Sequence, residues 1–105
     1  MKTVISASNN TLTASFDKRF GRAEWFCIYD DETKDVSFVV NEHVNASNGA
    51  GTKVAEKLID MGIKKAISGD FGPKAKELLD KFDVQMLIMQ EDGLTVEDII
   101  KKLTH

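Results

Sequence analysis

The sequence predicts an α/β fold in which one mixed five-stranded sheet carries helices on both faces. Three observations support this prediction. Three segments in the second half of the chain repeat apolar residues at helical spacing. Short apolar runs that are typical of buried strands lie between those segments. Two earlier strand-like runs flank a polar turn and indicate an antiparallel hairpin. The expected element order is therefore βββαβαβα.

Each strand is predicted from a short run of apolar, aromatic or β-branched residues. The predicted strands cover residues 2–7, 24–29, 36–40, 65–68 and 84–89. The run at 84–89 is almost unbroken apolar, which is typical of a strand that is covered on both faces. The polar residues 30–34 join the second and third strands into the hairpin.

The helices are predicted over residues 50–61, 73–81 and 96–103. In the first of them, Val54, Leu58 and Met61 share one face, and Gly62 follows as a typical C-terminal stop. Pro73 begins the second helix, where the missing N–H of proline has no cost.

A capping box is predicted at the third helix, where Thr95 is followed three residues later by Asp98 in place of the usual Glu or Gln. Strand–helix–strand crossovers in a parallel sheet are right-handed. The alternating second half of the chain therefore builds a parallel half of the sheet, and the hairpin adds an antiparallel strand.

Length and charge limit the possible functions. A chain of 105 residues fits a single domain over residues 1–105. With a net charge of −3, the protein is too acidic for general nucleic-acid binding, which requires a basic surface. No apolar run reaches the length of a membrane span, and the first short strand leads into polar residues unlike those of a signal peptide. We therefore expect a cytoplasmic protein with neither nucleic acid nor a membrane as partner.

Metal-ligating side chains are scarce. The single cysteine, Cys27, and the two histidines, His43 and His105, exclude an intramolecular disulfide and a CxxC site, and they argue against an all-protein zinc site. Cys27 lies in a strand among aromatic residues, where cysteine is usually a small buried hydrophobe, and a thiolate ligand for a soft metal is the alternative. His43 is expected in a polar loop, with contact to a ligand as the alternative. Both are weak candidate metal ligands.

The first loop with binding chemistry covers residues 17–23 and is called the arginine loop below. Guanidinium groups bind anionic oxygens in a bidentate manner, and a glycine lets a backbone approach a ligand closely. The alternative is a solvated loop in which Phe20 enters the core and Asp17 pairs with an arginine. The candidate binding residues in this loop are Arg19, Phe20, Gly21 and Arg22.

Two further loops are rich in glycine and open helices. The first covers residues 48–52, with Asn48, Gly49, Ala50 and Gly51 as candidate binding residues, and the second covers residues 68–73, with Gly72 as the candidate. Free N–H groups and the helix dipole make such starts receptive to anions. Neither loop has a nucleotide-binding fingerprint. The alternative is that Asn48 only caps its helix and that the glycines only permit close packing.

Parallel α/β sheets bind ligands beyond the carboxyl ends of their strands. The connectivity places the loop at 68–73 at that edge, and the loop at 48–52 opens a helix in the same way. We therefore expect the two glycine loops and the arginine loop to form one anion-binding rim.

The chain carries an ordered set of short motifs. They are Phe20-Gly21-Arg22-Ala23, Phe26, Asp30, Asn41, Gly49-Ala50-Gly51, Gly62, Gly69, Gly72-Pro73, Ala75 and Thr95-Val96-Glu97. In this order and spacing they resemble the dinitrogenase iron–molybdenum cofactor biosynthesis family, which is related to the cofactor carriers of nitrogenase assembly. The resemblance extends over essentially the whole chain.

The resemblance implies a ribonuclease H-like fold and a non-catalytic role in binding or carrying an iron–molybdenum or other metal–sulfur cofactor, or its precursor. It also implies partners that donate and accept that cofactor. Some relatives have histidine where Arg19 stands, and some have histidine or cysteine near the glycine loop, where the nearest such residue here is His43. An anionic cofactor suits a rim of helix N-termini and arginines.

An enzyme is not expected. Two-metal nuclease chemistry needs converging carboxylates, yet neither residues 2–7 nor residues 26–29 contain Asp or Glu. No Ser–His or Cys–His pair is indicated either. The alternative to a cofactor carrier is a small protein-interaction or regulatory module without cofactor, in which Trp25 and Phe71, if exposed, would anchor a partner.

Overall fold

The computed structural model describes residues 1–45 and 49–104, so Asn48 and His105 lie outside the described residues. Its elements follow the predicted order with one added turn of 3-10 helix. They are β1 (Lys2–Ala7), η1 (Phe20–Arg22), β2 (Trp25–Asp30), β3 (Val36–Val40), α1 (Ala50–Asp60), β4 (Ile63–Ser68), α2 (Pro73–Lys81), β5 (Gln85–Ile88) and α3 (Val96–Leu103).

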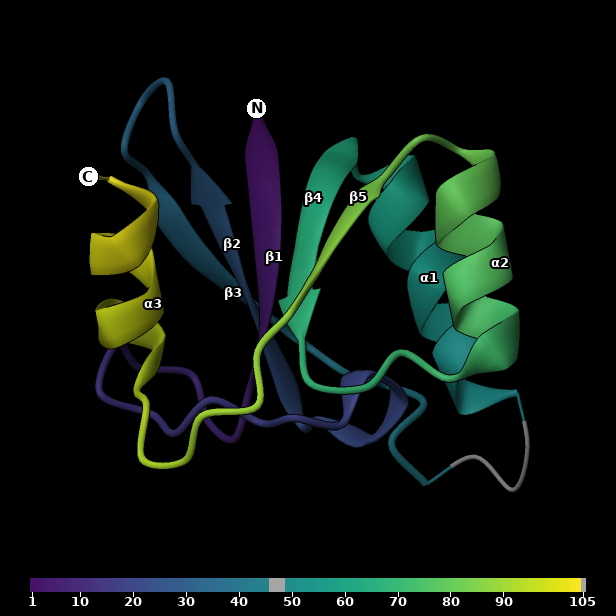
Figure 1. Ribbon diagram of the computed structural model, residues 1–105, viewed down its shortest axis with the longest axis horizontal. Helices are drawn as coiled ribbons and strands as arrows, with labels where there is room; N and C mark the ends of the chain where they lie inside the picture. The colour runs from purple at the N-terminus through teal and green to yellow at the C-terminus, as the bar shows by residue number, and fades with distance from the viewer. Residues whose placement is uncertain (46–48, 105) are drawn as a thin grey trace.

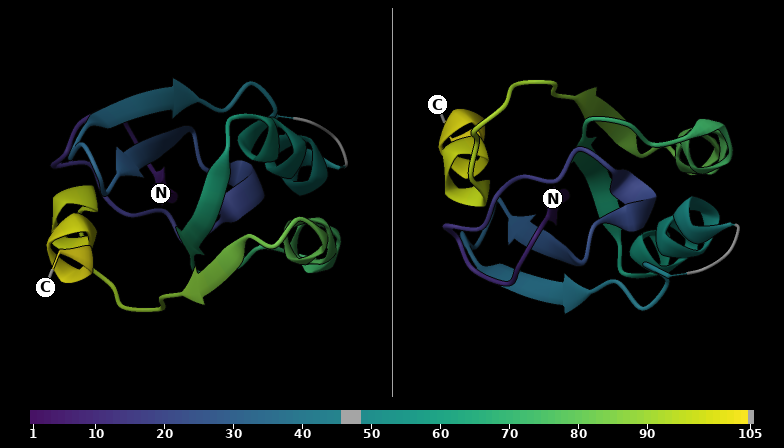
Figure 2. Two further views of the ribbon diagram at one scale, coloured as in Figure 1. Left: turned by 90° about the horizontal axis from the view of Figure 1, so that it is seen from above. Right: turned by 90° about the horizontal axis from the view of Figure 1, so that it is seen from below.

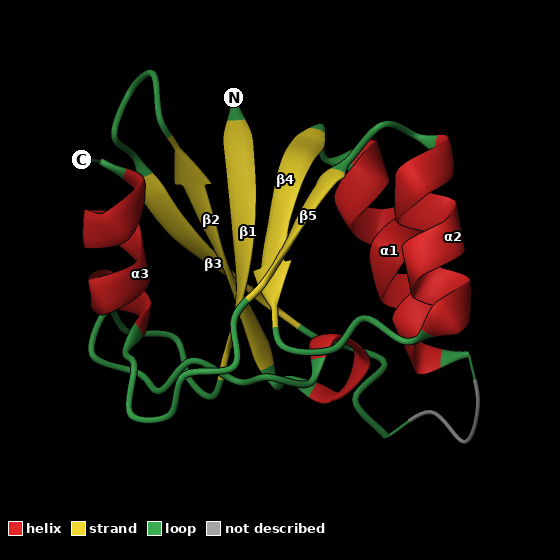
Figure 3. Ribbon diagram, viewed as in Figure 1, coloured by secondary structure: helices red, strands yellow, loops and turns green. Residues whose placement is uncertain are grey.

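The five strands form one mixed sheet in the order β3-β2-β1-β4-β5 (Figure 3). Strand β2 is antiparallel to both of its neighbours, and β1, β4 and β5 are parallel to one another. The predicted hairpin and the predicted parallel half are both confirmed. Since the parallel strands end at one edge of the sheet, the loops that follow them are brought together there.

Helices cover both faces of the sheet, as predicted (Figure 1). Helices α1 and α2 bury Val54, Leu58 and Leu79 against one face, whereas α3 buries Val96 and Ile99 against the other. Figure 2 shows the molecule from above and below the view of Figure 1, roughly along the strands, with α1 and α2 on one side of the sheet and α3 on the other. Burying one large aliphatic side chain contributes about 1.5–3 kcal/mol. Among the described helices, none has the length and apolar character needed to cross a bilayer.

Helix α3 begins with the predicted capping box. The Thr95 hydroxyl accepts a hydrogen bond from the Asp98 N–H at 3.1 Å, and the Asp98 carboxylate accepts one from the Thr95 N–H at 2.9 Å. The shorter Asp side chain therefore performs the role that Glu or Gln usually has.

Some predicted boundaries and environments were wrong. The strand expected over 84–89 is shorter and lies at the sheet edge, where Ile88 is 55% exposed. Its apolar run reflects packing of Met86 and Leu87 against opposite cores, rather than complete cover on both faces. The arginine loop also contains the short helix η1, which its charged residues had not indicated.

A close backbone contact joins η1 to the first turn of α1. A Cβ atom at Gly21 would lie 2.9 Å from the Gly51 nitrogen and 3.0 Å from the Gly51 Cα. A Cβ atom at Gly51 would in turn lie 3.3 Å from the Cβ of Ala75 in α2. Small residues at these three positions therefore let three separate segments meet.

Cys27 is fully buried in the core on the α3 side of the sheet. Burial raises the pKa of its thiol from an ordinary value of 9.0 to about 12. The prediction that Cys27 is a small buried hydrophobe is thus confirmed.

We predict that Gly21→Ala destabilises the protein by about 1–3 kcal/mol, because the new methyl group meets backbone that cannot move aside. Gly51→Ala is the comparison variant. Its methyl group would lie 3.3 Å from the Ala75 Cβ and 3.5 Å from the Phe71 carbonyl oxygen, which is less tight than the contact at Gly21. Because alanine also favours a helix by about 1 kcal/mol, Gly51→Ala should destabilise less than Gly21→Ala. Urea unfolding measures both. Equal stability of Gly21→Ala and wild type would contradict the close contact.

We also predict an alkaline loss of stability that depends on Cys27. The unfolded thiol ionises near pH 9.0, whereas the folded thiol stays protonated up to about pH 12, so rising pH between these values favours the unfolded state. Cys27→Ala should show a smaller decline in the free energy of unfolding across this range than wild type. Parallel declines in the two proteins would show that the folded thiol is not protected.

Candidate anion-binding site

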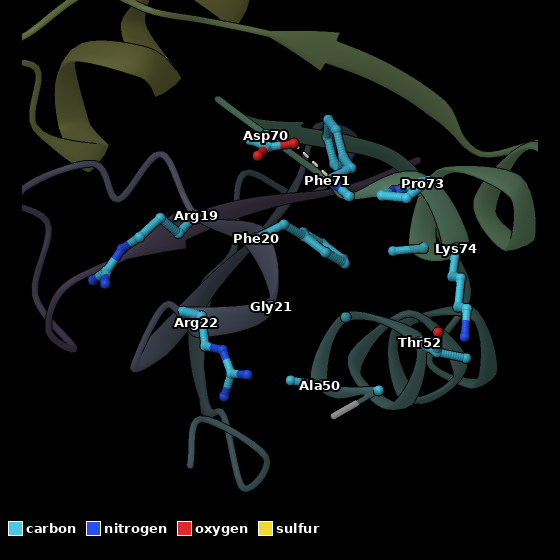
Figure 4. A pocket seen from close by; sticks show the side chains of 14 residues that line it. Arg19, Phe20, Gly21, Arg22, Ala50, Thr52, Asp70, Phe71, Pro73 and Lys74 are labelled. Atoms are coloured by element: carbon cyan, nitrogen blue, oxygen red, sulfur yellow. Dashed lines mark hydrogen bonds between the residues drawn. The ribbon is translucent and has the colours of Figure 1, made fainter. Parts of the chain in front are cut away.

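A pocket of about 420 Å³ opens where the arginine loop meets the N-terminal ends of α1 and α2 (Figure 4). It is lined by residues 19–22, 49–52 and 70–75. The structure therefore brings together the three loops that the sequence singled out, although Asn48 lies outside the described residues. Arg19, Phe20, Gly21, Arg22, Gly49, Ala50, Gly51 and Gly72 all line the pocket.

Hydrogen bonds to the backbone of the arginine loop hold it on its N-terminal side. The Asp17 N–H donates to the Ser6 carbonyl at 3.0 Å, and the Ser6 hydroxyl donates to the Asp17 carbonyl at 2.5 Å. The Phe20 N–H donates to the Asp70 carbonyl at 3.0 Å, beside the loop that follows β4. The loop therefore has a fixed path although it is rich in charge.

The guanidinium of Arg19 pairs with Asp17 and does not point into the pocket. Its Nε and Nη2 donate to the two carboxylate oxygens of Asp17 at 3.2 and 3.1 Å, and the side chain is 69% exposed. These hydrogen bonds to Asp17 raise the pKa of the guanidinium. Figure 4 shows the Arg19 side chain directed away from the pocket. The predicted pairing of Asp17 with an arginine is thus confirmed for Arg19, which is the weaker candidate for contacting a ligand.

Arg22 lies along the pocket rim. Its side chain extends toward the start of α1, near Ala50 (Figure 4). Its Nη1 donates to the Val44 carbonyl at 2.9 Å, which fixes the direction of the guanidinium. A fixed guanidinium at a pocket rim can donate hydrogen bonds to an anion with little loss of side-chain entropy.

Both helices at the pocket begin with glycine at the N-cap. Gly49 has a φ of 69° and Gly72 a φ of 77°, and neither can cap its helix through a side chain. The first turns of α1 and α2 contain no acidic residue, whereas α3 has its capping box and two acids. The positive dipole ends of α1 and α2 therefore lie at the pocket with no acidic residue in their first turns. At α2, Pro73 has no N–H and the Gly72 N–H donates to the Asp70 carboxylate, so donors for a ligand come from residues further into that turn.

Aromatic rings form the base of the pocket. The Phe20 and Phe71 rings are buried and lie 5.0 Å apart between centroids, and Phe26 lies 5.6 Å from Phe20. The alternative in which Phe71, if exposed, would anchor a partner protein is not supported, because Phe71 is only 5% exposed and packs in the core. Trp25 is partly buried against the core on the other face.

Sequence reasoning did not choose three polar residues of the lining as binding residues, although two of them lie in the glycine loops that it singled out. Thr52, Asp70 and Lys74 also border the pocket. Lys74 had a detectable signal, because a lysine in the first turn faces the positive end of a helix dipole, where a nearby anion would stabilise it. The Asp70 carboxylate accepts a hydrogen bond from the Gly72 N–H at 3.0 Å and so shapes the turn into α2. Thr52 ends the first glycine loop, but nothing in the sequence distinguished its hydroxyl as a binding group.

Neither candidate metal ligand lies in the pocket lining. Cys27 faces the opposite core, and the His43 N–H donates to the Asn41 side chain in the loop after β3. Within residues 1–45 and 49–104, His, Cys, Asp and Glu side chains form no group of three that could hold a metal ion. The described lining instead contains three basic side chains and one acidic side chain, so its chemistry suits an anion.

Known structures share this fold closely. The apo form of the orange protein from Desulfovibrio gigas superposes with a TM-score of 0.90 at 30% identity, over 98% of this chain and 86% of that one. A protein from Thermotoga described as a putative NifB protein superposes with a TM-score of 0.85 at 30% identity, over the same shares of the two chains.

The sequence comparisons agree with the structural ones. An uncharacterised protein of Methanocaldococcus jannaschii is 27% identical over 104 residues, which cover 96% of this chain and 83% of that protein. The family model described as dinitrogenase iron-molybdenum cofactor matches residues 1–105. The chain therefore belongs to the dinitrogenase iron–molybdenum cofactor family.

Proposed function

We propose that this protein binds an anionic metal–sulfur cofactor, such as an iron–molybdenum cluster or its precursor, and carries it without chemical change. The observation that supports the proposal best is the meeting of Arg22 with the N-termini of α1 and α2 in one pocket. Family membership supports the class of ligand. The proposed binding residues are those lining residues that the sequence had already indicated.

Electrostatics favour an anion in this pocket. Each helix N-terminus acts as roughly half a positive charge. Arg22 and Lys74 add two full positive charges at the rim and Asp70 subtracts one, so the balance stays positive. The whole protein has a net charge of −3. A locally positive pocket in an acidic protein attracts its anion while the rest of the surface does not compete for it.

The lining suggests binding through hydrogen bonds rather than through direct metal coordination. The described residues of the pocket offer backbone N–H groups, a guanidinium, an ammonium and the Thr52 hydroxyl. Sulfide-rich clusters expose anionic sulfur, which accepts such hydrogen bonds, and the aromatic base provides an apolar surface beneath them. A ligand held in this way can be released intact to another protein.

A carrier role needs partners that donate and accept the cofactor, and we propose such partners in cluster assembly. The Asp70 carboxylate is engaged by the Gly72 N–H, which leaves the described lining poorly suited to acid–base catalysis. The ribonuclease H-like grouping and a cytoplasmic location remain predictions. The alternative of an interaction module without cofactor has less support, because Phe71 is not an exposed anchor.

We predict that Arg22→Ala lowers affinity for tetrathiomolybdate, a simple molybdenum–sulfur anion, by roughly tenfold or more. A charged hydrogen bond to an anion contributes about 1.5–3 kcal/mol, and 1.4 kcal/mol corresponds to tenfold in affinity. Arg22→Lys should retain part of the affinity, because it keeps the charge and loses the planar fork. Anaerobic titration followed by visible absorbance measures all three proteins.

Lys64→Ala is the matched control. Lys64 is exposed on β4, outside the pocket lining, and its loss removes the same unit of charge. Its affinity should equal that of wild type. If Arg22→Ala keeps full affinity but melts at a lower temperature, Arg22 is structural and the proposed site is wrong.

A further inference from the structure

Asn41 is a buried polar residue just beyond the end of β3, and its side chain is only 4% exposed. Its amide nitrogen donates to the Gly21 carbonyl at 3.1 Å and to the Ala23 carbonyl at 2.8 Å. Its amide oxygen accepts a hydrogen bond from the His43 N–H at 2.9 Å. One side chain thus connects two separate loops.

These hydrogen bonds act on Arg22 from two sides. Gly21 and Ala23 flank Arg22 in the chain, so the amide nitrogen of Asn41 fixes the backbone that carries the guanidinium. His43 precedes Val44, whose carbonyl accepts from the Arg22 guanidinium at 2.9 Å. The amide oxygen of Asn41 therefore fixes the segment that orients the other end of the same side chain.

The chemistry of this position requires a primary amide. The two carbonyls need donors and the His43 N–H needs an acceptor, and a carboxamide supplies both from one short side chain. A carboxylate of the same shape would turn an oxygen toward two carbonyl oxygens. An alanine would leave these buried groups without their partner, and such groups are costly to leave unpaired.

We infer that Asn41 is a positioning residue: it holds Arg22 in its binding geometry before the ligand arrives. The inference rests on the proposed function, because it assigns how that site is organised. A site organised in advance binds more tightly, since less side-chain and loop freedom is lost on binding. Asn41 lies outside the pocket lining and acts through Arg22.

The test is a double-mutant cycle with tetrathiomolybdate as probe, at a temperature where every variant is folded. Asn41→Ala should weaken affinity roughly tenfold in the wild-type background and have almost no effect in the Arg22→Ala background. Asn41→Asp should weaken affinity at least as much as Asn41→Ala. Asn41→Ser, which keeps one donor, should fall between Asn41→Ala and wild type.

Thr95→Ala is the control for lost stability. It removes the cap of α3 on the opposite face of the sheet, and it should lower the melting temperature without changing affinity. If Asn41→Ala lowers the melting temperature as Thr95→Ala does and leaves affinity unchanged, Asn41 is only structural. Equal losses from Asn41→Ala in both backgrounds would also overturn the inference.

A measurement without ligand separates this inference from the proposed function. The measurement is the NMR order parameter of the Arg22 Nε–H bond in ligand-free protein. It should be high in wild type and in Thr95→Ala, and low in Asn41→Ala. If wild type does not bind tetrathiomolybdate, the proposed binding of a metal–sulfur anion is contradicted, whatever the state of Arg22. An ordered Arg22 side chain in Asn41→Ala contradicts the inference itself, whether or not the probe binds.

Discussion

The contact between the backbones of Gly21 and Gly51 is the constraint on which the rest of the site depends. A Cβ atom at Gly21 would lie 2.9 Å from the Gly51 nitrogen, so the approach is possible only where a side chain is absent. Gly51 in turn packs beside Ala75, which brings α2 to the same point. The N-terminal ends of both helices and the arginine loop therefore surround one pocket. The glycines are needed for packing and, for that reason, also for binding.

Packing around this contact places the charges. The arginine loop is held on one side by Ser6 and Asp70 and on the other by Asn41. Arg19 is drawn to Asp17, whereas Arg22 is directed along the rim by Val44. Two arginines three residues apart thus have different roles, and the difference follows from the path of the backbone. Two helices without acids in their first turns complete a positive pocket in an acidic protein.

Much of the fold could be predicted because its signals are local. Helices α2 and α3 have the predicted bounds, since Pro73 and Thr95 mark their starts and apolar periodicity marks their extents. The environment of β5 was not predicted, because an apolar run does not reveal that its strand is at an edge. The position of both glycine loops at one edge of the sheet could be predicted from the alternation of strands and helices along the chain. Lys74 could have been found from its place in the first turn of α2. The hydrogen bonds that Asn41 makes to two loops depend on contacts between distant segments, which sequence periodicity does not contain.

In the proposed complex, an anionic metal–sulfur group lies between Arg22 and the N-termini of α1 and α2. Crystals of the protein with tetrathiomolybdate, measured at the molybdenum absorption edge, would locate the metal directly. We predict one anomalous peak inside the pocket, with sulfur atoms within hydrogen-bond distance of the Arg22 guanidinium and of N–H groups in the first turns of the two helices. A peak at Cys27 or His43 with an empty pocket would contradict this prediction.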